Sequence, residues 1–204
     1  MKQAIETIQD GNNTIHIFSD DNPESPREWD NLGTMVCFHQ RYNLGDKDHD
    51  FRSWDDLNDY FKDNPSIVVF ICAYEHGGIT ISPYVPSETT LGYPFCDRFD
   101  SGWLGCVFVT LEDIRKEFGW KYVTGKRGKK IKQYLVSEIE TYDMHLTGDV
   151  YGYEVVCNTC NELLDSCWGF YGHDHEKSGL LEYAKGHVCK DCQAIENRLE
   201  AVLA

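Results

Sequence analysis

Alternating apolar and polar positions predict strands along much of the chain. The run SIVVFICAY at 66–74 is rich in valine, isoleucine and phenylalanine, as is typical of a buried central strand. The glycine pair Gly77-Gly78 predicts a tight hairpin turn into a partner strand at 79–84. Further strands are predicted at 14–18, 34–43, 103–110, 149–156 and 163–172.

Apolar residues three and four positions apart predict helices between these strands. The predicted helices are 54–63, 111–118, 129–146, a short one at 178–186 and a terminal one from 190 onward. Ser53 and Thr110 precede the first two helices and are expected to cap them. In the terminal helix, the spacing of Ile195, Leu199 and Val202 predicts that these side chains pack inward.

This order of elements predicts an α+β fold with a mixed or antiparallel central sheet and flanking helices. The sheet is expected to contain the strands at 34–43, 66–74, 79–84, 103–110 and 149–156. Residues 1–150 are expected to form this core domain, and residues 151–204 a metal-binding module packed on it. A long irregular excursion is expected at 86–102.

The C-terminal part contains two Cys-x-x-Cys pairs, CNTC at 157–160 and CKDC at 189–192. Two such pairs supply four thiolates, which is the ligand set of a tetrahedral structural zinc site. The first pair follows a predicted strand at a polar turn, and the second opens a predicted helix. This layout resembles a treble-clef zinc module, with Cys157, Cys160, Cys189 and Cys192 as ligands of Zn²⁺.

A site of four thiolates leaves no open coordination position, so it would be structural and not catalytic. Three other interpretations stay open. The ligand set could be mixed, with one cysteine replaced by Cys167, His173, His175 or His187. The pairs could also be redox-active, or the cysteines could be buried without a metal.

The chain is strongly acidic, with 19 Lys and Arg against 34 Asp and Glu, a formal net charge of −15. Such a charge argues against direct nucleic-acid binding by the chain as a whole. The exception is the segment 115–132, which holds eight bases and one acid. Neither a span of roughly 20 apolar residues nor a signal-peptide core is visible, and a cytoplasmic protein with reduced cysteines is expected.

Catalytic chemistry has weaker support. No nucleophile-elbow, zinc-protease or phosphate-loop motif occurs in the sequence, and no catalytic residue is assigned. Carboxylates crowd one loop: Asp20, Asp21, Glu24, Glu28 and Asp30. With His39 or His76 as a general base, this loop could form a metal-dependent hydrolase site. Among the other thiols, Cys96 is expected to be the most exposed, and Cys167 is expected to lie in the core.

Four segments carry a resemblance: DNPESPREWDNLGTMVCFHQRYNLGD (21–46), HGGITIS (76–82), DSGWLGCVFVTLEDIRKEFG (100–119) and DSCWGFYG (165–172). Together they resemble a family of small, largely uncharacterised phage and prophage proteins. The resemblance implies a virus-encoded protein made in the cytoplasm of a bacterial host, and it supplies no catalytic residues. In that family the region at 155–167 is often a plain acidic hairpin, so zinc would be an addition in this chain.

These observations lead to three hypotheses on function. The first is an accessory protein that binds a host protein or protein–nucleic-acid complex and inhibits a defence system of the CRISPR or restriction type. Acidic mimicry of DNA would be one means. The second is the hydrolase described above, and the third is a zinc-based nucleic-acid binder using Lys132 and its basic neighbours. The candidate partner-contacting residues are Asp20, Asp21, Glu24, Glu28, Asp30, Lys126, Arg127, Lys129 and Lys130.

Overall fold

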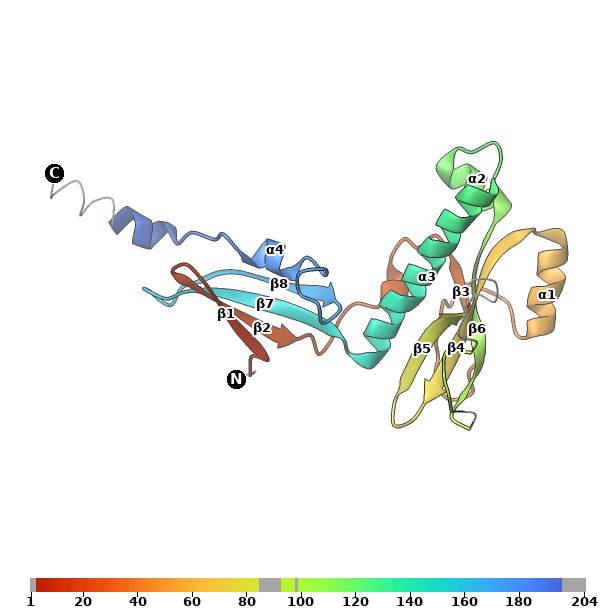
Figure 1. Cartoon of the computed structure of the whole chain (residues 1–204), viewed down its shortest axis with the longest axis horizontal. Coiled ribbons are helices and arrows are strands. Elements are labelled where there is room, and N and C mark those ends of the chain that lie inside the picture. The colour runs from red at the N-terminus through yellow and green to blue at the C-terminus, as the bar shows by residue number, and fades with distance from the viewer. Residues whose placement is uncertain (1–2, 85–92, 98, 196–204) are drawn as a thin grey trace. The chain divides into compact units, whose positions relative to one another are not determined.

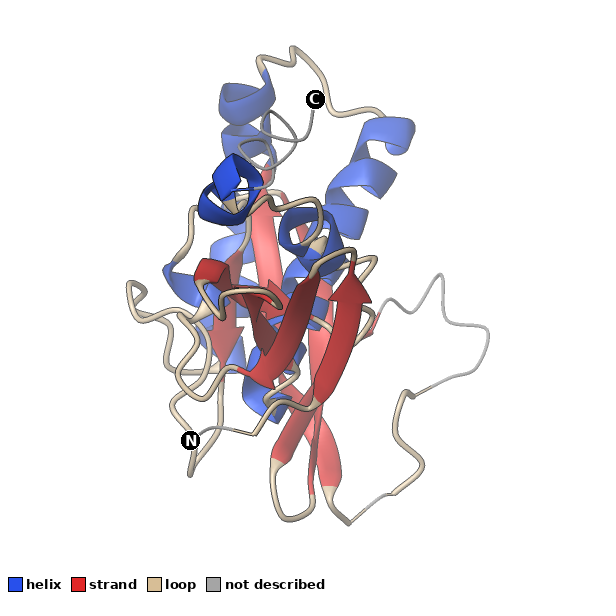
Figure 2. Ribbon diagram, turned by 90° about the vertical axis from the view of Figure 1, so that its left-hand side faces the viewer, coloured by secondary structure: helices blue, strands red, loops and turns tan. Residues whose placement is uncertain are grey.

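The protein forms two compact units. The structure, a computed structural model, describes residues 3–84, 93–97 and 99–195. Unit 1 combines residues 1–24 with residues 148–204, and unit 2 comprises residues 25–147. The fold is α+β, with one antiparallel sheet in each unit (Figure 1; Figure 2, strands in red).

Unit 2 is built on a four-stranded sheet of order β3-β6-β4-β5. The strands are β3 (Thr34–Cys37), β4 (Ser66–Glu75), β5 (Ile79–Tyr84) and β6 (Ser101–Thr110). The central pair β4 and β6 is antiparallel, from Ser66 opposite Thr110 to Tyr74 opposite Ser101. The β4–β5 turn contains Gly77 at a φ of 74°, as a tight hairpin requires. These strands confirm the predicted antiparallel core.

The long helix α3 (Gly125–Thr147) packs on one face of this sheet. It buries an apolar stripe at the predicted helical spacing: Ile131, Leu135, Ile139 and Tyr142. The stripe belongs to one core with Val69, Ile71 and Val107, which alternate along β4 and β6. This face is therefore the main core of unit 2.

The opposite face carries α1 (Trp54–Asp63), as Figure 1 shows. The Ser53 hydroxyl accepts a hydrogen bond from the Asp56 amide at 3.2 Å and caps the helix as predicted. Leu57 is fully buried in a small aromatic core that includes Phe108 of β6. The neighbouring helix α2 (Leu111–Phe118) begins at its predicted cap, Thr110, and ends at Gly119.

Unit 1 contains the second sheet, of order β1-β2-β7-β8. The strands are β1 (Glu6–Asp10), β2 (Asn13–Ser19), β7 (Val150–Cys157) and β8 (Leu163–Tyr171). A short helix, α4 (Leu180–Ala184), packs Leu180 and Ala184 against Ile15, Ile17 and Tyr153 of the sheet. Unit 1 thus has an apolar core of its own.

The division of the chain differs from the predicted boundary at residue 150. The strand predicted at 149–156 was expected in the central sheet, and this expectation is wrong, because β7 pairs with β2 from Asn13 opposite Cys157 to Ser19 opposite Tyr151. The alternating pattern identifies both strands correctly but carries no information on which partner each one chooses. The N-terminal strands therefore belong with the cysteine-bearing segment.

Three smaller expectations also change. Strand β3 ends at Cys37 and not at residue 43, because the ring of His39 accepts hydrogen bonds from the next backbone amides and turns the chain. Ile195 is 58% exposed, so its inward packing is wrong, while Leu199 and Val202 lie outside the described residues. Of the excursion expected at 86–102, residues 86–92 and 98 lie outside the described residues, and its last two residues, Ser101 and Gly102, belong to β6.

None of the described helices has the length and apolar character needed to span a bilayer.

Candidate functional site

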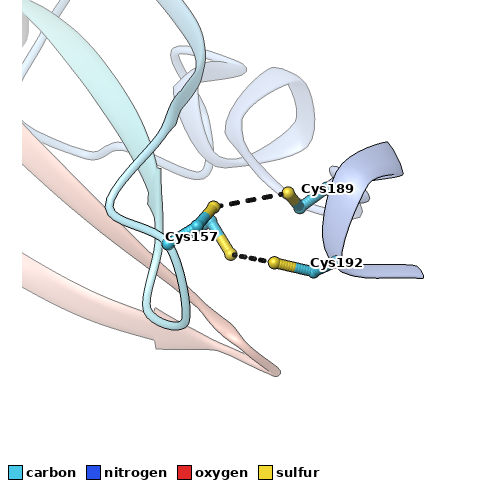
Figure 3. A group of neighbouring side chains, drawn as sticks. Cys157, Cys189 and Cys192 are labelled. Atoms are coloured by element: carbon cyan, nitrogen blue, oxygen red, sulfur yellow. Dashed lines mark hydrogen bonds between the residues drawn. The ribbon is translucent and has the colours of Figure 1, made fainter. Parts of the chain in front are cut away.

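Four cysteines of unit 1 converge at one end of its sheet (Figure 3). Cys157 is the last residue of β7, and Cys160 closes the tight turn that leads into β8. Cys189 directly precedes a helical segment that starts at residue 190, and Cys192 lies in its first turn. The expected knuckle and the expected helix start are both confirmed, and the four residues could bind a metal ion.

The sulfur positions suit a tetrahedral ion. All four ligand atoms lie within 4.8 Å of one another. The Sγ atoms of Cys157 and Cys192 are 3.8 Å apart, and those of Cys160 and Cys189 are 3.6 Å apart. A tetrahedron of sulfurs bonded at about 2.3 Å has edges of about 3.8 Å. The side chains need little movement to coordinate one ion.

The protonation of the thiols also reflects this crowding. Hydrogen bonds from the backbone amides of Cys160 and Thr159 lower the pKa of Cys157 to about 7. Hydrogen bonding of the Cys192 thiol to Cys189 and Cys160 raises its pKa. Without a cation, ionisation of one thiol therefore disfavours ionisation of its neighbours. A divalent cation would stabilise all four cysteines as thiolates, offsetting two of their four negative charges, and would release the remaining protons.

The tip of the β1–β2 hairpin holds both halves of the site. The Asn12 side chain donates to Thr159 Oγ1 at 2.8 Å, and the Asn12 carbonyl accepts from the Asn158 amide at 2.9 Å. The side-chain amide of Asn13, which is 5% exposed, donates to the His187 carbonyl at 2.7 Å. The turn between β1 and β2 therefore positions the knuckle and the segment before Cys189. Local sequence patterns do not reveal this role.

The three histidines considered as alternative metal ligands have carboxylate partners instead. His173, His175 and His187 approach Asp149, Glu6 and Asp165 respectively, at 3.3–3.5 Å. Cys167 is exposed on β8, which corrects its expected place in the core. Among the described residues, the four cysteines are the one group of three or more potential metal ligands that lie close enough together to hold an ion.

The acidic loop at 20–30 does not form a comparable group. Asp20 and Glu24 belong to unit 1, whereas Glu28 and Asp30 belong to unit 2. The carboxylate of Asp20 accepts a hydrogen bond from the Asn22 amide at 3.1 Å, as in a simple turn. Asp30 lines a hollow of about 600 Å³ in unit 2 with Trp29 and residues of α2 and α3. The loop thus forms the N-terminal connection between the two units.

The two histidines considered for catalysis have separate carboxylate partners. His39 Nε2 lies 3.4 Å from Glu75, which also binds Arg41. His76 is largely exposed, and its Nδ1 lies 3.0 Å from Asp100. Neither pairing includes a residue of the acidic loop, so the structure does not assemble the hydrolase constellation.

The basic segment, residues 115–132, includes the first turns of α3. The guanidinium of Arg127 lies 4.5 Å from the ring centre of Trp120, and the Lys130 ammonium lies 5.5 Å from that of Tyr134. Lys126 and Lys129 are exposed. Cationic side chains of the chain itself, Arg127 and Lys130, therefore already lie over aromatic rings of this surface.

A further feature of unit 2 is an aromatic area on the outer face of its sheet, which α1 covers only in part. Beyond α1, a hollow of about 400 Å³ is lined, within the described ranges, by four aromatic side chains: Trp54, Phe70, Tyr84 and Trp103. Trp103 is 51% exposed, because a bulge opposite Ile71 and Cys72 shifts the register of β6. We refer to this feature as the Trp103 hollow.

The remaining thiols separate into buried and exposed groups. Burial raises the pKa of Cys37 and Cys106 to about 12 and that of Cys72 to about 11. Iodoacetamide at about pH 8 should therefore spare these three in the native protein and modify Cys96 and Cys167, which are exposed. Peptide mapping by mass spectrometry, with a denatured control, would measure this. Equal rates at Cys106 and Cys96 would contradict the structure.

Comparison with known proteins adds no relative. No protein-family model, curated protein sequence or solved structure matches the chain.

Proposed function

We propose that the chain is a zinc-stapled binding protein that acts on a protein partner. Zinc is favoured at the four-cysteine site because thiolates are soft ligands and the sulfur spacing fits a tetrahedral ion. All four positions would be filled by the protein, so the ion would have a structural role. It would pin the helical segment from residue 190 to the β7–β8 turn.

The Trp103 hollow carries the binding part of this proposal. Large exposed aromatic surfaces are uncommon on monomeric proteins and are typical of interaction sites. Tryptophan and tyrosine are also the residues that contribute most to protein–protein affinity. Three of the four lining residues, Trp54, Tyr84 and Trp103, are of these two types. A surface of this kind supports recognition of another protein.

The proposed partner is a component of a bacterial host. The resemblance to phage and prophage proteins favours an accessory protein that inhibits a defence system, for example of the CRISPR or restriction type, in the host cytoplasm. The net charge of −15 would steer the chain toward basic surfaces, including those that bind DNA. Nucleic acid is the weaker candidate ligand, since the basic segment 115–132 is small against that charge.

A quantitative pull-down from bacterial lysate tests this function. The tagged full chain is compared with an unrelated protein of similar size and net charge as bait. The expected result is one host protein captured in a fixed stoichiometry, with less capture as salt rises, because surface charges are screened. Capture of the same proteins by both baits, or of none, would contradict the proposal.

A further inference from the structure

Trp103 lies where three hollows of unit 2 meet. It lines the Trp103 hollow and also two neighbouring hollows. One neighbour is lined by residues that include His39, Arg41, Glu75, Phe99 and Asp100, and Phe99 is 98% exposed. The other contains Phe95 and Asp97. The exposed indole therefore stands at the centre of an extended surface.

The rings of this surface hold one another in place. The ring centres of Trp103 and Tyr84 are 5.1 Å apart at 75°, and those of Trp103 and Phe70 are 5.7 Å apart at 73°. Tyr93 meets the same indole edge-on at 5.7 Å and 77°. Such edge-to-face contacts are the favoured geometry of aromatic pairs. The hollow is thus preformed, which lowers the entropy cost of binding.

Carboxylates dominate the surroundings of the rings. The helix α1, which supplies Trp54, carries four exposed aspartates and one lysine: Asp55, Asp56, Asp59, Asp63 and Lys62. The two neighbouring hollows add Glu75, Asp97 and Asp100. Among the described residues that line them, the basic groups are His39 and Arg41, and both approach Glu75. An apolar centre is therefore bordered by excess negative charge.

We propose that the Trp103 hollow binds a cationic segment of a partner protein that inserts one tryptophan, phenylalanine or leucine side chain. The apolar side chain would fill the hollow, whose volume of about 400 Å³ lies in the range of about 300–1,000 Å³ of ligand pockets. Lysine and arginine residues on either side of it would face the carboxylates, and an arginine could also stack on the exposed indole. This inference rests on the proposed binding function and names its site and ligand chemistry.

The charge distinguishes this ligand from other partners of aromatic surfaces. Nucleic acids and anionic membranes both carry negative charge and would be repelled by the bordering carboxylates. A second copy of the chain would bring a net charge of −15 against the same face. A basic protein segment is the partner whose charge complements both the rim and the chain.

Defined peptides test the proposal. Acetylated, amidated pentapeptides Lys-Arg-X-Arg-Lys, with X as Trp, Leu or Ala, are titrated into the ¹⁵N-labelled full chain up to about 1 mM, a range that detects weak binding. The indole N–H signals of Trp103 and Trp54 are expected to shift in a saturable manner with Trp or Leu at X. Affinity should fall at least about tenfold with Ala at X, because the anchor is lost. An acidic peptide, Glu-Asp-Trp-Asp-Glu, should not bind.

Two protein variants and one control locate the site. Trp103→Ala should weaken binding of the Trp peptide at least about tenfold. Asp55→Lys replaces the exposed carboxylate next to Trp54 in the sequence by a cation and should weaken binding without affecting the fold, so it tests the site even if Trp103→Ala unfolds. The control is Tyr122→Ala, which removes a ring that is 65% exposed in the basic segment of the same unit and should leave the affinity unchanged.

Three results would overturn the proposal: no saturable shift with the Trp or Leu peptide, equal affinity for the Ala peptide, or unchanged affinity in both site variants. Indole shifts that depend on protein concentration without peptide would point to a second copy and would also overturn it. The binding function is judged separately in the lysate pull-down. If Trp103→Ala captures the partner as well as the unmodified chain, the function stands and this site is wrong; if the unmodified chain captures none, the function fails.

Discussion

Removal of metal from the four-cysteine site is expected to release the helical segment from residue 190 while unit 2 remains folded. Cys189 and Cys192 would connect this segment to the β7–β8 turn through the ion, and structural zinc sites contribute about 10–16 kcal/mol of binding free energy. Trypsin cleavage after Lys190, which is exposed, should therefore accelerate at least about tenfold with a chelator. Limited proteolysis followed by mass spectrometry measures this rate.

A pair of variants separates loss of the site from loss of any thiol. Cys192→Ser removes one ligand and should give fast cleavage without chelator. Cys167→Ser changes an exposed thiol outside the group and should behave like the unmodified chain. Unit 2 has its own core, so its thermal unfolding should not change in either variant. Equal cleavage with and without chelator would show that no ion holds the segment.

Arg27→Ala is expected to destabilise unit 2 by about 3–5 kcal/mol, because it removes a buried cation and leaves two partly buried carboxylates without it. The Arg27 side chain is 5% exposed. Its guanidinium donates to both oxygens of Asp46, at 2.7 and 2.8 Å, and to Glu138 of α3 at 3.1 Å. Burial lowers the pKa of Arg27, but Asp46 and Glu138 raise it overall, so the group stays charged. Chemical denaturation measures the loss.

The pH dependence of this variant adds a second test. Burial already raises the pKa of Glu138, and without Arg27 the pKa of Glu138 should rise further. The folded state then binds more protons than the unfolded state, so stability falls as pH rises. The deficit relative to the unmodified chain should therefore be larger at about pH 7 than at about pH 5.

A matched control comes from an exposed arginine. Arg41 binds Glu75 at 2.5 Å, but its side chain is 73% exposed, so Arg41→Ala should cost less than about 1 kcal/mol. Similar losses for the two variants would mean that the Arg27 network is not buried in solution.

Local patterns predicted much of this structure correctly. The capped helices α1 and α2, the amphipathic α3 and the β4–β5 hairpin each depend on residues within one or two turns of chain. The grouping of the four cysteines, which could bind a metal ion, was also predicted, because each Cys-x-x-Cys pair encodes half of such a site locally. Features with short-range causes were therefore accessible from the sequence.

Features that depend on distant contacts were not. Arg27 stands in a proline-rich loop and looks like an ordinary surface charge. It is buried because Gly33 lets the loop approach α3 closely: a Cβ there would lie 2.6 Å from Leu135. Asn13 has a similar hidden role, because its partner, the carbonyl of His187, is 174 residues away in the sequence.

Trp103 shows a third limit. The run WLGCVFVT predicts a buried strand, and this is correct from Leu104 onward. Trp103 itself is 51% exposed, since the bulge and the limited length of α1 leave this end of the sheet uncovered. Apolar character predicts which residues prefer burial, but it does not show which of them are left without a helix or strand that covers them in the folded protein.

X-ray absorption at the zinc edge, on protein purified from bacteria without added metal, would examine the proposed staple itself. One zinc ion per chain, surrounded by four sulfur atoms at about 2.3 Å and by no nitrogen or oxygen, is the predicted result. Protein without zinc, or a shell in which a nitrogen or oxygen atom replaces one sulfur, would contradict a closed structural site formed by the four cysteines.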